Sequence, residues 1–302
     1  MNKLKAWLSA ARLRTLPLSI SGILVGTALA NYEGYTNDLV FILALLTTIF
    51  FQITSNFAND YGDGVKGTDN DDRVGPQRAL QSGSLTRSEL LVGIFISSSI
   101  SLVLTIFLVI MAFGMDRLPY VLVFLMLGII SIWAALKYTM GKSPYGYQGF
   151  GDLFVFLFFG LVAVLGSKFL YTLSISTMDF LPAIGIGMLC VGVLNLNNLR
   201  DVLSDKKHGK NTLIVKMGFR NGKRYHYALL GIGFLCFIVF TFLKMNTLLG
   251  WSYLVFFIPV SIHFIKVLNT DQPKSLDPEL KKLALSTFAI AFCQYITVNY
   301  FL

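Results

Sequence analysis

Nine apolar stretches, separated by turns or charged residues, constrain this chain more than any other feature. Each is about 17–24 residues long, enough for a helix to cross the roughly 30 Å hydrocarbon core of a bilayer. Charged residues make up only 14% of the chain, whereas a soluble domain carries about 25%. We therefore predict an all-α polytopic membrane protein, a bundle of about nine transmembrane helices that forms a single domain over residues 1–302. The stretches lie near residues 16–32, 38–57, 90–113, 118–138, 152–172, 180–199, 226–244, 249–268 and 283–302.

The basic residues predict how the bundle is oriented. All but three of the 25 Lys and Arg residues fall on the side that holds the N-terminus, the exceptions being Arg117, Lys168 and Lys244. Cytoplasmic flanks of membrane helices are enriched in Lys and Arg. We therefore expect a cytoplasmic N-terminus, with the long polar connections 58–89 and 200–225 on the same side. The net charge of +9 is then a topology signal, and no nucleic-acid partner is expected.

The first long connection opens with oxygen-bearing side chains at the mouth of a span. Asn56, Asp60 and Asp63 are spaced four and three residues apart, so on a continuing helix they share one face. Carboxylates at the end of a membrane helix are costly and usually functional. Hard cations such as Mg2+ bind one or two carboxylates together with phosphate oxygens. Taken alone, the cluster is also typical of a helix cap followed by a polar loop.

A second cluster makes the metal hypothesis stronger. Asn197, Asp201 and Asp205 stand four residues apart at the end of another span on the same side of the membrane. If the two faces oppose each other, their carboxylates repel, and two Mg2+ ions bridging to a diphosphate would relieve that repulsion. Basic side chains would meet the remaining phosphate charge. Those nearest the second cluster are Arg200, Lys206 and Lys210.

A diphosphate bound at the membrane surface implies a lipid attached to it. If this lipid is an allylic polyprenyl diphosphate, departure of the diphosphate leaves a delocalised cation, which aromatic faces can shield. The chain has 26 Phe residues, several of them between Phe150 and Phe159, although packing or lipid contact is the better explanation for any single one. An ion-coupled transporter usually keeps a charge near the middle of the membrane, and the apolar stretches are almost free of charge. A non-catalytic lipid transporter remains the less favoured alternative.

At these two clusters the chain resembles the UbiA-type superfamily of intramembrane prenyltransferases, which attach isoprenoid chains to aromatic rings. The motifs of that superfamily read Asn-x-x-x-Asp-x-x-(x)-Asp and Asp-x-x-x-Asp, and Asn56, Asp60, Asp63, Asp201 and Asp205 match them. A narrower resemblance is to the 1,4-dihydroxy-2-naphthoate polyprenyltransferases of menaquinone synthesis. Four stretches carry it: residues 12–17, 55–67 with 72–78, 144–152 and 197–213.

The resemblance implies a Mg2+-dependent enzyme that prenylates the naphthoate ring with loss of its carboxyl group, giving demethylmenaquinone. Its partners would be a polyprenyl diphosphate, an aromatic acid and membrane lipid. It would lie in the plasma membrane (the bacterial inner membrane) with its active site facing the cytoplasm. Another aromatic acceptor, such as 4-hydroxybenzoate or homogentisate, stays open at this point, as does the oligomeric state.

The site residues expected on this basis fall into three groups. Those expected to bind metal are Asn56, Asp60, Asp63, Asp201 and Asp205. Those expected to bind diphosphate are Asn59, Lys66, Arg73, Lys142, Asn197, Arg200, Lys206 and Lys210. Those expected to hold the aromatic substrate or support catalysis are Arg14, Arg78, Tyr138, Tyr145 and Asp152. Tyr138 and Lys142 are equally typical of interfacial anchors, and where some relatives carry a further Asp this chain has Gly67, which leaves a metal role for Asp69 open.

Overall fold

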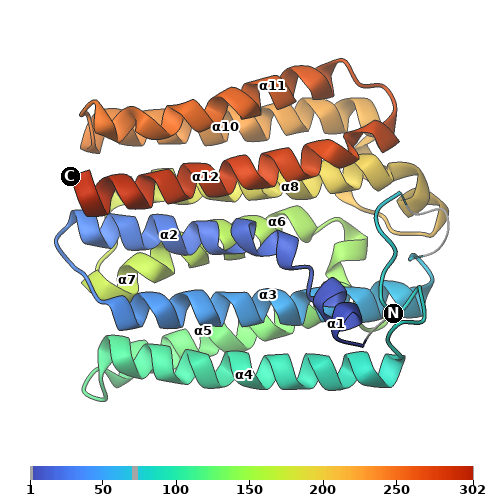
Figure 1. Ribbon diagram of the computed structural model, residues 1–302, viewed down its shortest axis with the longest axis horizontal. Helices are drawn as coiled ribbons and strands as arrows, with labels where there is room; N and C mark the ends of the chain where they lie inside the picture. Colours follow the sequence, from blue (N-terminus) through green and yellow to red (C-terminus); the bar gives the residue numbers. More distant parts are fainter. Residues whose placement is uncertain (1–2, 70–73, 302) are drawn as a thin grey trace.

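The computed structural model describes residues 3–69 and 74–301, and every regular element within them is helical (Figure 1). Nine helical segments in these ranges are long and apolar enough to cross a membrane, which confirms the predicted fold class. The helices are α1 (Lys3–Ala11), α2 (Leu16–Tyr32), α3 (Asp38–Lys66), α4 (Arg87–Phe113), α5 (Leu118–Lys137), α6 (Gly151–Val155), α7 (Ser167–Thr172), α8 (Phe180–Lys207), α9 (Leu213–Met217), α10 (Phe219–Lys244), α11 (Phe257–Leu268) and α12 (Asp277–Phe301).

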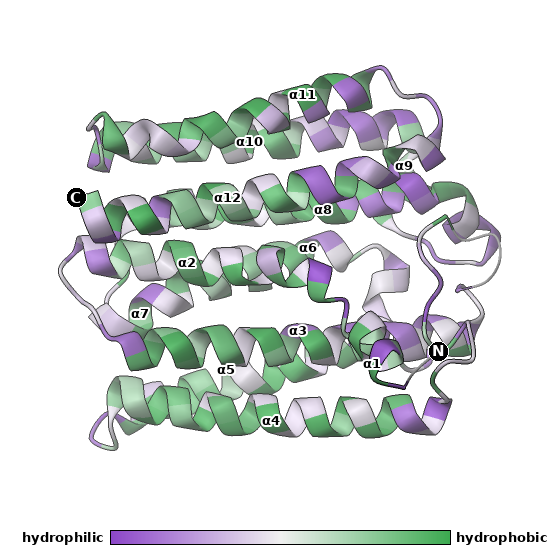
Figure 2. Cartoon of the chain, viewed as in Figure 1, coloured by the Kyte–Doolittle hydropathy of each residue, from purple (hydrophilic) through white to green (hydrophobic). Residues whose placement is uncertain are grey.

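The long helices run nearly side by side in one bundle (Figure 1). The helix α3 packs along α4 and α8 along α10, while α2 packs against α12, so that the first and last long helices of the chain lie side by side. The largest apolar core joins α2, α8, α10 and α12. Figure 2 shows green hydrophobic residues along the length of the bundle and purple residues at its ends.

Both helices that carry the predicted motifs continue beyond their apolar stretches. The helix α3 begins where the Asn37 side chain accepts the Val40 N–H, and it runs on to Lys66. It ends at Gly67, whose backbone φ of 73° lies in the left-handed region that favours glycine. The helix α8 likewise continues to Lys207. Both motifs are therefore helical, as their spacing requires.

The fifth span departs from regular α-helix. Between α6 and α7, residues Phe156–Gly166 form a π-helical stretch, a form that is rare and often marks functional sites. Gly160 lies against Gly187 of α8 so closely that an added Cβ would meet the Gly187 Cα at 2.7 Å. The span is therefore held tightly against α8 at this point, while Phe158, Phe159 and Val162 of the same stretch line a cavity.

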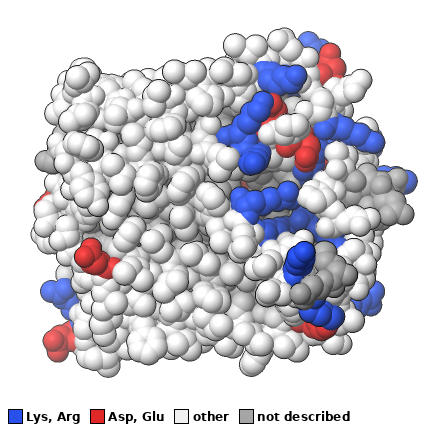
Figure 3. Space-filling model, viewed as in Figure 1, with Lys and Arg blue, Asp and Glu red and all other residues white. Residues whose placement is uncertain are grey.

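Charged residues gather at one end of the bundle. Figure 3 shows Lys, Arg, Asp and Glu around a hollow at this end, whereas the rest of the visible face is almost uncharged. The connections that follow α3 and α8 both lie at this end (Figure 1). The structure thus places the two polar connections on one side, as predicted from the sequence, and the candidate active site lies at this charged end.

Candidate active site

A cavity of about 1040 Å³ opens at the charged end of the bundle. Both predicted clusters contribute to its wall, although they stand more than a hundred residues apart in the sequence. The helix α3 supplies Asn56, Asn59 and Asp63, and α8 supplies Asn197, Arg200, Asp201 and Asp205. The opposition of the two helix ends, which the sequence could only suggest, is therefore present in the fold.

Asp63 is the centre of the first cluster. Its Oδ1 accepts a hydrogen bond of 2.8 Å from the Tyr147 hydroxyl, and its Oδ2 lies 3.7 Å from the Lys210 ammonium. Burial alone would lower the pKa of Lys210, but the carboxylates of Asp63 and Asp205 outweigh it and raise that pKa above its usual value. Lys210 is therefore a fixed positive charge between acidic groups from both clusters.

Arg200 organises the second cluster. Its guanidinium donates two hydrogen bonds to Asp201, of 2.8 and 2.6 Å, in the bidentate geometry that binds carboxylates most strongly. The same group donates to Asn197 at 2.9 Å and to Asp277 at 2.6 Å. Asp277 opens α12, so Arg200 ties the motif on α8 to the last helix of the chain.

The structure gives Asp60 a different neighbourhood from the one expected. Its side chain is fully buried and accepts the backbone N–H groups of Ala79 at 3.1 Å and Leu80 at 3.4 Å. Among the described residues that line the cavity, Asp60 is absent. In this arrangement Asp60 fastens the loop that carries Arg78 to α3.

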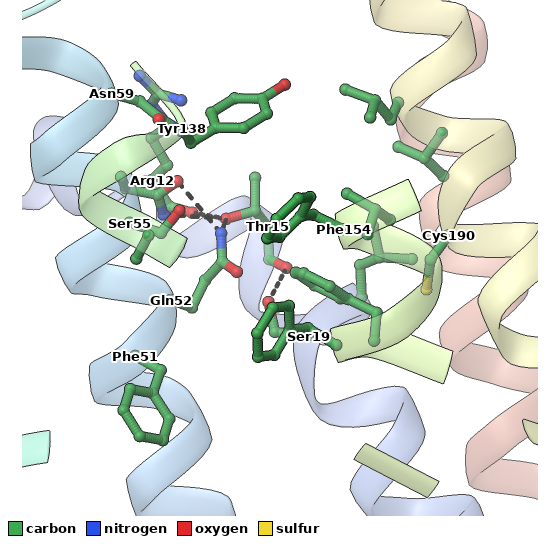
Figure 4. Close-up of a pocket in the computed structure, with 18 of the residues that line it drawn as sticks. Arg12, Thr15, Ser19, Phe51, Gln52, Ser55, Asn59, Tyr138, Phe154 and Cys190 are labelled. Carbon is green, nitrogen blue, oxygen red and sulfur yellow. Dashed lines mark hydrogen bonds between the residues drawn. The ribbon is translucent and has the colours of Figure 1, made fainter. Parts of the chain in front are cut away.

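Aromatic rings line the cavity beside the carboxylates. Tyr138, Tyr145, Phe154 and Phe158 form a continuous series, in which Tyr145 and Phe154 stack with their centroids 3.9 Å apart. Figure 4 shows Tyr138 and Phe154 on this wall. Burial raises the pKa of Tyr138 to about 12, and the nearby Asp63 carboxylate acts in the same direction. The wall is thus neutral and electron-rich, a surface that suits an aromatic ring or an organic cation.

A polar network continues the first cluster deeper into the bundle. The Asn56 amide donates to the Ala11 carbonyl at 2.8 Å and to Thr15 Oγ1 at 3.2 Å, and Gln52 donates to Asn56 Oδ1 at 3.2 Å. Figure 4 shows Gln52 and Ser55 on α3 with Thr15 beside them. The cavity-facing residues of α3 recur at helical spacing. They are Ala44, Thr47, Thr48, Phe51, Gln52, Ser55, Asn56, Asn59 and Asp63.

Some of the predicted site residues lie outside the cavity wall. Within the described chain, the cavity wall does not include Lys66, Lys142, Lys206 or Asp152. Lys66 donates to the Gly141 carbonyl at 2.8 Å, and Asp152 is buried and hydrogen-bonded to Tyr225. Arg73 falls outside the described residues. The wall does include Arg14, Arg78, Tyr138, Tyr145, Asn59, Asn197, Arg200 and Lys210.

Three contributors to the site were missed by reasoning from the sequence. Gln52 lies four residues before Asn56 on the same helical face, so spacing alone would have found it. Tyr147 stands two residues after Tyr145, and only the fold shows that its hydroxyl reaches Asp63. Asp277 offered no local signal, because its role depends on α12 beginning next to Arg200.

The residues of the cavity fit a hard divalent cation in donor chemistry. Asp63, Asp201 and Asp205 present only oxygen ligands to one space, with asparagine amides beside them. Among the described residues, no three acidic, His or Cys side chains already converge on a single point. Instead, Lys210 and Arg200 stand beside the carboxylates. A metal ion bound together with a diphosphate would neutralise part of the carboxylate charge that Lys210 and Arg200 now neutralise. These two side chains would then be available to contact the phosphate oxygens.

Comparison with known proteins defines the class. The model of the UbiA prenyltransferase family matches residues 19–288, and the chain belongs to this family. Solved structures share the fold: a UbiA homologue from Aeropyrum pernix has a TM-score of 0.71 at 13% identity, covering 92% of this chain and 96% of its own. A UbiA homologue from Archaeoglobus fulgidus, bound to DMAPP and Mg2+, has a TM-score of 0.63 at 16% identity, covering 96% and 99%.

More similar relatives carry a particular name. The 1,4-dihydroxy-2-naphthoate octaprenyltransferase of Haemophilus influenzae is 42% identical over 294 residues, which are 95% of this chain and 94% of the relative. The protein of the same name from Escherichia coli is 43% identical over 84% of this chain and 82% of its own. These relatives match the subfamily that the four sequence stretches indicated.

Proposed function

We propose that this chain transfers a polyprenyl group from polyprenyl diphosphate to 1,4-dihydroxy-2-naphthoate, with decarboxylation, giving the reduced (quinol) form of demethylmenaquinone. The observation that carries the proposal is the meeting of Asp63 on α3 with Asp201 and Asp205 on α8 across one cavity. The names of the similar relatives support the acceptor. The nine spans form one catalytic domain in the plasma membrane, with the charged end in the cytoplasm, in keeping with the predominance of Lys and Arg there.

In this proposal Asp63, Asp201 and Asp205 hold Mg2+, as the bound metal of the Archaeoglobus homologue supports. Bound there, the metal would stabilise negative charge on the departing diphosphate. Lys210 and Arg200 contact the remaining phosphate oxygens, Lys210 as a point charge and Arg200 through its planar fork. Asp60 fastens the Arg78 loop over the site.

The reaction balances without any further reactant. The prenyl carbon–oxygen bond breaks, and its electron pair leaves with the diphosphate. The ring carbon that bears the carboxylate attacks the allylic cation and forms the new carbon–carbon bond. The bond between that carbon and the carboxylate then breaks, CO2 departs, and the electron pair restores the aromatic ring. A prenylated quinol, CO2 and diphosphate result, with no net release of a proton.

The protein contributes orientation and a dry, electron-rich surface. Tyr145, Phe154 and Phe158 shield the allylic cation from water, and their stacked faces hold it by cation–π attraction. Arg14 and Arg78 line the cavity on the side of α2 and of the loop after α3. We assign these two residues to the carboxylate of the aromatic acid, which must stay ionised until CO2 leaves.

The decisive experiment supplies the purified protein with Mg2+, a polyprenyl diphosphate and one of three acceptors. We expect prenylated product and CO2 from dihydroxynaphthoate, and little product from 4-hydroxybenzoate or homogentisate. Preference for another acceptor would refute the subfamily assignment. Asp201→Asn should abolish product without loss of folded protein. The matched control is Asp38→Asn on α3, an exposed acid at the other end of the bundle. Normal turnover by Asp201→Asn would refute the metal role of Asp201, whereas absence of product from the wild-type protein with all three acceptors would favour a non-catalytic lipid carrier.

A further inference from the structure

The cavity extends far beyond the groups that the chemistry uses. Along the continuous helix α3, the lining runs from Asp63 back to Ala44. At a rise of 1.5 Å per residue, this stretch of helix is about 28 Å long, close to the thickness of a bilayer core. The diphosphate and the aromatic acid both belong at the charged end, because the reacting carbon adjoins the diphosphate. The prenyl tail is therefore the part of the substrates that fits the rest of the cavity.

A cluster of aromatic rings lies at the far end of the cavity. The Phe124 ring of α5 lines the cavity and stacks on Phe169 of α7, with their centroids 5.8 Å apart. Phe113 of α4 meets Phe124 edge-on at 5.1 Å, and Tyr120 meets Phe169 at 5.3 Å. Four rings from three helices thus form a floor. Behind it, Lys168 forms ion pairs of 2.6 Å with both Glu33 and Asp179, which lock these elements together.

Gly166 leaves open space in front of this floor. A Cβ built at Gly166 would find only one atom within 4 Å, Phe124 Cε1 at 3.8 Å. Other glycines of the bundle behave differently: a Cβ at Gly26 or Gly128 would meet its neighbours at 2.3 and 2.9 Å. Gly26 and Gly128 serve close packing, whereas a side chain at Gly166 would project into the cavity next to the Phe124 ring.

We propose that Phe124 and the bare backbone at Gly166 set the depth available to the prenyl tail, and with it the longest polyprenyl diphosphate that the enzyme accepts. This inference rests on the proposed function and names the determinant of its donor specificity. A tail that reaches Phe124 must stop or fold back, because Phe113 and Phe169 pack behind that ring. A shorter tail ends before Gly166 and contacts neither Gly166 nor Phe124.

The experiment measures donor selectivity in two variants with opposite effects. Gly166→Leu fills the deep end, and Phe124→Ala removes the ring that closes it. With Mg2+ and dihydroxynaphthoate, kcat/KM is measured for geranyl, geranylgeranyl and octaprenyl diphosphates. We expect Gly166→Leu to lower the ratio of octaprenyl to geranyl activity by about tenfold or more, since overpacking a rigid cavity is costly. Phe124→Ala should raise this ratio, and an unchanged ratio would show that Phe124 does not limit the tail.

The matched control is Gly231→Leu, which adds the same side chain on α10 where a Cβ would meet nothing within 4 Å. It should keep the wild-type ratio. If Gly166→Leu lowers activity equally with all donors, or not at all, the tail does not reach the floor and the proposal fails. If the wild-type protein prenylates dihydroxynaphthoate with none of the donors, the proposed function fails instead, so the two failures are distinguishable.

Discussion

Replacement of Asp60 by Asn separates two roles that the sequence alone could not distinguish. The motif predicts a metal ligand, whereas the fold shows a fully buried carboxylate that accepts the N–H groups of Ala79 and Leu80 at 3.1 and 3.4 Å. Asn keeps one acceptor oxygen and presents an NH2 group in place of the other. Both backbone N–H groups therefore lose a charged acceptor, and one of them faces a donor instead. Hydrogen bonds to charged groups contribute about 1.5–3 kcal/mol, so we expect Asp60→Asn to lower the free energy of unfolding by about 2 kcal/mol.

The assay combines thermal unfolding in detergent with prenyl transfer measured over a Mg2+ titration. Asp60→Asn should unfold at a lower temperature yet require the same Mg2+ concentration for half-maximal activity. Asp63→Asn, which changes a cavity-facing acid on the same helix, should behave in the opposite way, with a raised Mg2+ requirement and a smaller change in unfolding. Asp38→Asn controls for the loss of one negative charge from α3.

The reasoning would be refuted by an Asp60→Asn protein that unfolds like the wild type but needs much more Mg2+. Asp60 would then turn toward the metal in the substrate complex and act as a ligand. The comparison with Asp63→Asn distinguishes the two roles, because both variants remove one carboxylate from the same helix and only Asp63 lines the cavity.

Three further predictions follow from individual contacts. Lys210→Ala should lower kcat/KM by about tenfold or more, because it removes a fixed positive charge beside the phosphate site. The control Lys206→Ala changes a residue outside the cavity wall and should have little effect. Equal losses of kcat/KM in the two variants would contradict the assignment of Lys210. Tyr147→Phe removes the 2.8 Å donor to Asp63 and should cost about 1 kcal/mol in transition-state stabilisation, measured as kcat/KM with unchanged thermal unfolding. Lys168→Met removes the charged partner of the buried Asp179 and of the more exposed Glu33 at the other end of the bundle. Because a buried charge on Asp179 is left without its counter-ion, the unfolding free energy should fall by about 3–5 kcal/mol, while the donor concentration needed for half-saturation stays the same. An unchanged unfolding temperature would show that the ion cluster is not structural.

The fold class could be predicted because it depends on a local property. Each apolar segment has the length that a bilayer requires, and a membrane helix satisfies its own backbone hydrogen bonds without help from distant residues. The nine segments could therefore be recognised one at a time from the sequence, although the residues at which the helices end could not. The apolar run of the second span suggested an end near residue 57, whereas α3 continues to Lys66 and stops only at the left-handed Gly67.

Within the site, the periodicity of each helix determined which residues share a face, and so placed Asp63 and Asp201 correctly toward a common space. Gln52 belongs to the same face and was within reach of the same argument. The orientation of Asp60 could not be predicted in this way, because its carboxylate turns toward a loop whose position helical spacing cannot specify.

The amino-acid sequence by itself thus determined the membrane class, the number of spans, the two acidic motifs and the resemblance to one family of prenyltransferases. Only the tertiary structure decided which motif residues face the cavity, that Tyr147 and Asp277 join them, and where the aromatic floor closes the tail end. The physical reason is distance along the chain. Helix formation and membrane insertion are governed by neighbouring residues, whereas the contact of Lys210 with Asp63, or of Arg200 with Asp277, exists only once helices far apart in sequence have packed.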